Sequence, residues 1–201
     1  MDGMERYVPI AWRVCRALDN PVRLAMLRVV LTSRRPMTVG DICDRVAEKE
    51  SVTSQYLRQL NAQGFIVATR RGRNVLYERR KDADRALTRV IDELEAMFTR
   101  GGHGWMEAVL ETLPGFSNAR KTCMLSTLRN QGSLKIETLA ERTCMPVKTC
   151  YRIVGELSGC RLVGWSDRTD CVTLHAPTGD LSLALYELVT GRRPILTYYN
   201  I

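Results

Sequence analysis

Residues 20–80 constrain the fold of this chain most, because signals for helices, turns and strands follow one another there without interruption. Pro21 stands where proline suits the first turn of a helix, and the residues after it are amphipathic. Apolar side chains recur at helical spacing in residues 38–46, and a further helical stretch runs over residues 51–63 to the helix-stopping Gly64. The stretch therefore predicts three short helices in succession.

A pair of strands follows the third helix. Residues 65–70 and 75–78 have strand character, and the turn between them, residues 71–74, contains two arginines and a glycine. A helix-turn-helix followed by a basic hairpin is the arrangement of a winged helix. Such a module holds DNA with its last helix and its hairpin.

The positive charge of the chain is concentrated in its first half. The 201 residues carry a formal net charge of +8, and residues 1–100 hold 19 Lys+Arg and 13 Asp+Glu against 11 and 9 in the remainder. This balance suits an anionic partner, although part of it is ordinary solvated surface. No apolar run is long enough to cross a membrane, and residues 1–20 lack the apolar core of a signal peptide. We therefore expect a soluble, cytoplasmic protein that does not engage a membrane.

A later stretch of the chain repeats the same pattern. Residues 38–67 align without a gap on residues 135–164, and the residues around Asn20 align on those around Asn118 with a one-residue change of register. Any two helix-turn-helix units share core periodicity, so the match does not require a duplication. The common order of helices and strands in the two stretches favours a duplication.

The predicted fold class is mainly α with small β-hairpins, arranged as tandem winged helix-turn-helix domains. Three glycines in residues 100–104 supply the boundary, because glycine disfavours a continuous helix. The predicted parts are a DNA-binding domain over residues 1–100, a second, degenerate winged-helix domain over residues 104–190 and a C-terminal tail over residues 191–201.

Three motifs of the first copy resemble the arsenic-repressor (ArsR-like) superfamily of bacterial winged-helix regulators. Residues 17–27 are similar to its opening helix, residues 51–66 to its recognition helix and residues 70–77 to its wing, with Tyr56 where the family commonly has histidine. The resemblance implies a sequence-specific transcriptional regulator, repressor-like, that binds double-stranded DNA as a homodimer. It also implies a palindromic operator, and an unknown small-molecule or metal effector that releases the DNA.

Nine residues form the predicted DNA contact set. A recognition helix buries one side and offers polar and basic groups to the major groove, so Gln55 can read adenine and Arg58 can meet guanine or phosphate. Thr53 belongs to the set although it also falls on the inward stripe, and Ser51 doubles as a candidate N-cap. The full set is Ser51, Thr53, Ser54, Gln55 and Arg58 on the helix, and Arg70, Arg71, Arg73 and Asn74 on the wing.

The wing arginines suit phosphate contact or insertion into the minor groove. The alternatives to DNA contact are that the polar helix residues form an ordinary solvated face and that the arginines only keep the hairpin soluble.

The second copy departs from the first at both of these places. Its turn contains Asp167 and Asp170, which would repel phosphate, and its third helix contains Glu156 and the helix-weakening Gly155. We therefore expect weak DNA binding by this copy, or none. It then makes a protein interface, binds an effector or packs against the first domain. A pseudo-dimer that spans two half-sites stays open as an alternative.

The seven cysteines do not predict a metal site. There is no CxxC, and Cys43 stands alone where the resemblance implies a Cys-x-Cys thiolate site. A metal or redox sensor remains an alternative, with Cys171, His175 and one further ligand, Cys160 or Cys144. No phosphate loop, paired carboxylates or histidine-assisted nucleophile is present, so the sequence predicts neither a cofactor nor an enzyme.

Two functional classes follow. The first is the regulator, dimerised through helices in residues 7–18 and 82–99; the second of these carries an apolar stripe. The second class is a tandem winged-helix adaptor in chromosome organisation or replication, which mainly binds protein.

Overall fold

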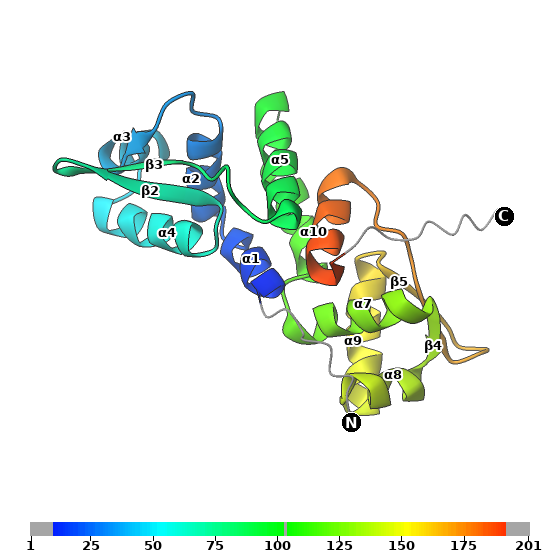
Figure 1. The fold of residues 1–201 in the computed structure, drawn as a ribbon. Helices are drawn as coiled ribbons and strands as arrows, with labels where there is room; N and C mark the ends of the chain where they lie inside the picture. Colours follow the sequence, from blue (N-terminus) through cyan, green and yellow to red (C-terminus); the bar gives the residue numbers. More distant parts are fainter. Residues whose placement is uncertain (1–9, 103, 192–201) are drawn as a thin grey trace. The chain divides into compact units, whose positions relative to one another are not determined.

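The computed structural model describes residues 10–102 and 104–191. The chain divides into two compact units: the first unit is Arg13–Glu111, and the second unit is Thr112–Ile201 with Met1–Trp12. Each contains several helices and one small antiparallel sheet (Figure 1). The predicted fold class, mainly α with small β-hairpins, is confirmed. Among the described residues no helix combines the length and apolar character needed to span a membrane.

The first unit follows the predicted order of helices and strands. Its sheet has the order β1-β3-β2, so the short strand before the helix-turn-helix pairs with the far strand of the hairpin. Its elements are α1 (Ile10–Leu18), which enters the unit at Arg13, α2 (Pro21–Leu31), β1 (Met37–Thr38), α3 (Val39–Val46), α4 (Glu50–Ala62), β2 (Ile66–Arg71), β3 (Asn74–Arg79), α5 (Arg85–Arg100) and α6 (Trp105–Thr112).

The second unit repeats this order, and its sheet has the corresponding order β4-β6-β5. Its elements are the 3₁₀ turn η1 (Leu113–Gly115), α7 (Ala119–Gln131), β4 (Ser133–Lys135), α8 (Ile136–Thr143), α9 (Val147–Gly159), β5 (Val163–Ser166), β6 (Cys171–Leu174) and α10 (Asp180–Thr190).

Matching elements of the two units lie 97 residues apart over α3–β2 and α8–β5. The residues that end α3 and α8, Ala47 and Cys144, both adopt left-handed backbone, with φ of 54° and 52°. After α4 the amide of Phe65 donates to the carbonyl of Leu60 at 3.1 Å, and the amide of Leu162 makes the same bond 97 residues later at 3.0 Å. The repeated spacing therefore corresponds to a repeated backbone path.

Local capping explains where the helices of the first unit begin. The Asn20 side chain accepts the amide of Arg23 at 2.9 Å, and Thr38 and Asp41 form a reciprocal capping box at the start of α3. Both satisfy amides that have no partner within the helix. The core then forms from fully buried apolar side chains of successive elements. They are Leu24 and Leu27 of α2, Ile42 of α3, Leu57 and Leu60 of α4, and Phe65 and Ile66 at the hairpin.

Several predicted boundaries shift by a few residues. Helix α4 begins at Glu50 after Lys49, whose side chain makes no cap bond, so the prediction that Ser51 is the N-cap was wrong. The helix expected over residues 82–99 begins only at Arg85, because Asp84 caps it. In the predicted N-terminal helix over residues 7–18, the first three residues lie outside the described part, as does the predicted tail after Gly191.

Candidate nucleic-acid interface

Helix α4 presents the polar face that a recognition helix requires. Leu57 and Leu60 are fully buried, and this fixes the opposite side of the helix toward solvent. Ser54 is half-buried, and Arg58 folds along the helix so that its Nε donates to the Ser54 carbonyl at 3.1 Å. The exposed side chains of this face are Ser51, Gln55, Arg58 and Gln59.

Thr53 does not belong to this face. Its side chain is fully buried, so its place in the predicted contact set was wrong: the inward stripe takes precedence at this position. Within the described residues its hydroxyl has no hydrogen-bond partner. The equivalent residue of the second unit, 97 positions later, is the fully buried Cys150, a small apolar side chain that needs none.

We expect Thr53→Val to raise the free energy of unfolding by about 1 kcal/mol, because it replaces an unpaired buried hydroxyl by a methyl group of similar shape. Urea denaturation of the full chain measures the change. Thr127→Val is the comparison. The Thr127 hydroxyl donates to the Cys123 carbonyl at 3.0 Å, so its removal should lower the free energy of unfolding. A loss of stability in Thr53→Val would contradict the assignment.

Arg23 of α2 holds the end of α1 and α4 together. Its Nε and Nη2 donate to the carbonyls of Ala17 and Arg16 at 2.7 and 2.9 Å, and its Nη1 donates to Gln59 Oε1 at 3.1 Å. The guanidinium also lies over the Tyr56 ring, 5.3 Å from its centroid. The Arg23 side chain therefore fixes the orientation of the Gln59 amide. The amide oxygen of Gln59 accepts from Arg23, and its amide nitrogen remains as a hydrogen-bond donor.

Arg23→Lys should lower the free energy of unfolding by about 1–3 kcal/mol, because lysine keeps the charge but cannot donate in three directions from a planar group. Chemical denaturation measures this. The control is Arg45→Lys on the exposed surface of α3, for which little change is expected. Equal stability of both variants would show that the Arg23 bonds contribute nothing.

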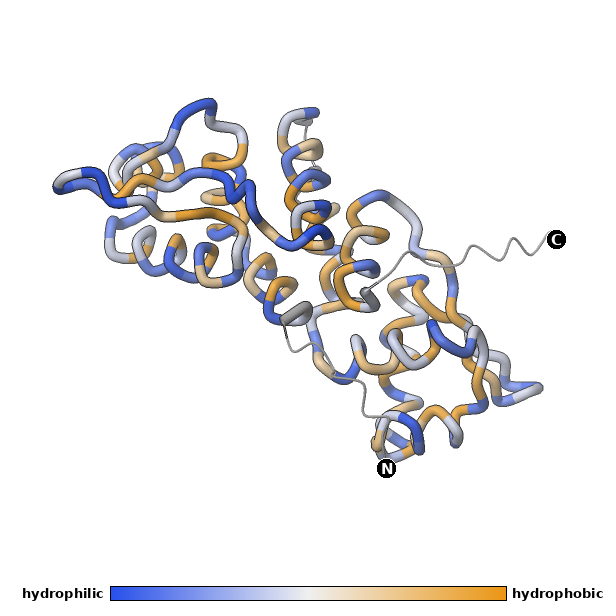
Figure 2. The backbone as a smooth tube through the Cα atoms, viewed as in Figure 1, coloured by the Kyte–Doolittle hydropathy of each residue, from blue (hydrophilic) through white to orange (hydrophobic). Residues whose placement is uncertain are grey.

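The β2–β3 hairpin, which we call the wing, places its arginines at an exposed tip. Arg71 pairs with Asn74 across a two-residue turn in which Gly72 has φ of 61°, a conformation that favours glycine. All residues from Thr69 to Val75 are exposed, and none is acidic. The tip projects beyond the helices (Figure 1) and is strongly hydrophilic (Figure 2). Arg70, Arg71, Arg73 and Asn74 therefore lie together.

The next arginines along β3 serve a different purpose. Arg79 is paired with Asp92 and with Glu95 of α5, the latter at 3.2 Å. Arg80 lies 3.8 Å from Asp82. These pairs neutralise the base of the wing, so its unneutralised positive charge is at the tip.

The roles of Gln59 and Arg23 were not predicted from the sequence. Gln59 follows Gln55 by one helical turn, and this spacing was sufficient to place it on the same face. Arg23 is 36 residues from its Gln59 partner, so no local pattern reveals the contact.

The second unit has different chemistry at the corresponding positions. Glu156 on α9 is paired with Arg152 and lies 2.8 Å from Lys121 Nζ, which also donates to the Pro114 carbonyl at 2.9 Å. Lys121 is almost buried. The hydrogen bond from Lys121, and then the charges of Lys121 and Arg152, hold the pKa of Glu156 below its ordinary value. Glu156 therefore ties α9 to α7, a role the sequence did not suggest.

This pairing predicts a pH dependence of stability. A carboxyl group with a lowered folded-state pKa contributes stability above its unfolded pKa, near 4.3, and loses it as the pH falls through the folded value. Unfolding free energies at pH 7 and at successively lower pH should therefore fall more steeply for the native chain than for Glu156→Gln. The exposed Glu141→Gln variant is the control. Parallel curves for all three proteins would contradict the prediction.

The cysteines do not assemble a metal site within the described residues, where no group of three or more His, Cys, Asp or Glu side chains has suitable geometry. All seven thiols are free. Burial raises the pKa of Cys15 to about 12 and also raises the pKa of Cys123, Cys150 and Cys160. These four thiols are therefore held in their protonated, weakly reactive form.

Residues 20–67 match the family model of the bacterial regulatory proteins of the arsR family. No match was found among curated proteins or among solved structures. The matched segment runs from the cap of α2 through the recognition helix into β2, which are the elements just described. The helix-turn-helix of the first unit therefore resembles that of bacterial regulatory proteins of the arsR family.

Proposed function

We propose that this chain is a sequence-specific, repressor-like regulator that places α4 in the major groove and its wing on phosphates or in the minor groove. The observation that carries the proposal is the acid-free, exposed tip from Thr69 to Val75, together with the polar exposed face of α4. Helix and wing supply the two kinds of contact that groove recognition uses. The proposal assigns the chain a binding role without a catalytic step.

The proposal includes a homodimer, since two copies present two recognition helices to a palindrome. The helices α1 and α5 are the proposed contacts. In the predicted stripe of α5, Val90, Ile91 and Leu94 are buried, and Leu87 and Met97 are half-buried. Leu87 and Met97 are therefore the side chains of the stripe that remain available to contact a second copy. An effector that changes this dimer would release DNA; the described residues suggest no ligand for it.

The test is selection of bound fragments from fragmented genomic DNA with the purified full chain. A recurrent palindrome is the expected result, because it requires both base reading and two-fold binding. The same selection with Gln55→Ala should change the preferred base at one position of each half-site. Absence of any enriched sequence with the native protein would overturn the proposal and favour the adaptor.

A further inference from the structure

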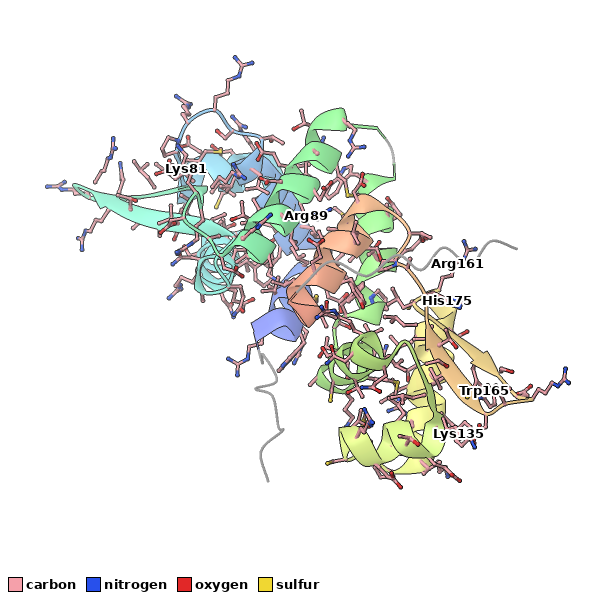
Figure 3. The ribbon with its side chains drawn as sticks, turned by 45° about the vertical axis from the view of Figure 1, so that its right-hand side comes forward. Lys81, Arg89, Lys135, Arg161, Trp165 and His175 are labelled. Atoms are coloured by element: carbon pink, nitrogen blue, oxygen red, sulfur yellow. The ribbon has the colours of Figure 1, made fainter. Side chains whose placement is uncertain are left out.

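The second unit carries an exposed apolar cluster formed by Val147, Tyr151 and Trp165, which we call the aromatic patch. Their exposed fractions are 40%, 41% and 45%, and in the described part of the chain Val75 is the one other large apolar side chain so exposed. The rings of Tyr151 and Trp165 meet edge to face with centroids 5.5 Å apart. Trp165 lies on the hairpin of the second unit (Figure 3). Val147 stands one helical turn before Tyr151 on α9, so three of these four side chains lie at neighbouring positions of α9 and β5.

The aromatic patch lies on α9 and β5, the elements that correspond to α4 and β2 of the first unit. At the 97-residue spacing, Tyr151 takes the place of Ser54 on the recognition helix, and Trp165 takes the place of Ala68 on the wing strand. Small side chains have been replaced by the two residue types that contribute most at protein interfaces. The change therefore points to recognition of protein rather than of a DNA groove.

The charges around the aromatic patch favour a cation and oppose phosphate. The Tyr151 hydroxyl donates to Asp170 Oδ1 at 3.2 Å, and Asp167 is exposed on the same turn. The pKa of Tyr151 is raised by desolvation, by this hydrogen bond and by the negative charges of Asp170 and Glu137. The Asp170 carboxylate therefore lies beside the Tyr151 ring, where it can pair with a bound cation.

Positive groups on the same elements limit which cation fits. Lys148 and Arg168 are exposed, whereas Arg152 is neutralised by Glu156. A densely basic segment would be repelled by these groups. A single cationic side chain within an otherwise uncharged segment would not.

We propose that the aromatic patch binds an arginine side chain presented by an otherwise uncharged segment of a partner protein, with the guanidinium stacked on Trp165 and paired with Asp170. Arginine fits better than lysine, because its planar group stacks on aromatic rings and matches a carboxylate with two parallel donors. The second unit then links this chain to that partner. The inference is independent of the proposed DNA contacts, since none of its residues belongs to the first unit.

The test is selection from a random peptide display library on the immobilised full chain. The expected result is enrichment of peptides with one arginine between uncharged residues. A selected peptide, synthesised with a fluorescent label, should bind about tenfold less tightly when its arginine is replaced by citrulline, which keeps the shape and removes the charge. Trp165→Ala and Asp170→Asn should each cause a similar loss, and Val75→Ala, in the exposed wing, is the matched control.

Asp170→Asn keeps the test valid if Trp165→Ala disturbs the hairpin. Asp170 has φ of 50°, a left-handed conformation that asparagine also tolerates. The proposal would be overturned if no peptide were enriched, or if the enriched peptides lacked arginine. It would also be overturned if a selected peptide bound the native chain, Trp165→Ala and Asp170→Asn equally tightly. So would weaker binding of Trp165→Ala to selected DNA, which would make DNA the occupant. If sedimentation showed that Trp165→Ala changes the protein from dimer to monomer, the aromatic patch would bind a second copy of the chain. That result would also overturn the proposal.

Discussion

Replacing Arg71 and Arg73 together by alanine is expected to weaken binding to selected DNA by about 100-fold. Two charge-assisted contacts of roughly 1.5 kcal/mol each are lost, and each 1.4 kcal/mol corresponds to a factor of ten. Both side chains are exposed at a tip where no acidic residue stands from Thr69 to Val75. Their removal therefore leaves the packed part of the first unit intact. Fluorescence anisotropy with labelled duplex measures the affinity.

The salt dependence provides a second measurement on the same variant. If both arginines meet phosphates, the slope of log affinity against log salt should become shallower by about 1.8, because each neutralised phosphate contributes about 0.9. Arg168→Ala, on the turn of the second unit between Asp167 and Asp170, is the control and should leave the affinity unchanged. Unchanged affinity of the double variant would show that the wing does not hold DNA.

The largest expected effect on stability is that of Phe65→Ala, which should lower the free energy of unfolding of the first unit by about 3–5 kcal/mol. Phe65 is fully buried where α4 turns into β2, and its backbone bonds to Leu60 and to Arg80 on either side. Removing the ring leaves a cavity between the recognition helix and the wing. Both elements of the proposed DNA contact would lose their common support.

Guanidinium denaturation followed by circular dichroism measures the loss, and DNA affinity at a temperature where the variant is still folded shows whether the wing has shifted. Val75→Ala is the control, since Val75 is 37% exposed and its truncation should change stability by no more than about 0.5 kcal/mol. A loss below that seen for Val75→Ala would contradict the placement of Phe65 in the core.

Most of the helix and strand order was predictable because local signals determine it. Pro21 in the first turn of α2, the stop at Gly64 and the strand character after Phe65 each act within a few residues. The errors at Ser51 and Thr53 also have local causes. The helix begins one residue before Ser51 without a side-chain cap, and the inward stripe includes Thr53 despite its polar hydroxyl.

The contacts that join distant segments were not predictable in this way. Arg23 meets Gln59 across 36 residues, and Lys121 meets Glu156 across 35. From the sequence alone, Glu156 was interpreted only as a negative charge that weakens DNA binding by the second copy. In the structure it partners an almost buried lysine. Which charges remain available to a ligand is decided by such pairings.

The sequence by itself determined the repeated path of the chain and the basic tip of the wing, because periodicity, caps and turn residues act over short distances. The tertiary structure alone decided which polar groups are consumed internally and which apolar groups remain exposed. Arg79 is neutralised at the base of the wing, whereas Tyr151 and Trp165, 14 residues apart, meet on an open face. The physical reason is that burial and pairing depend on the packing of whole elements against one another.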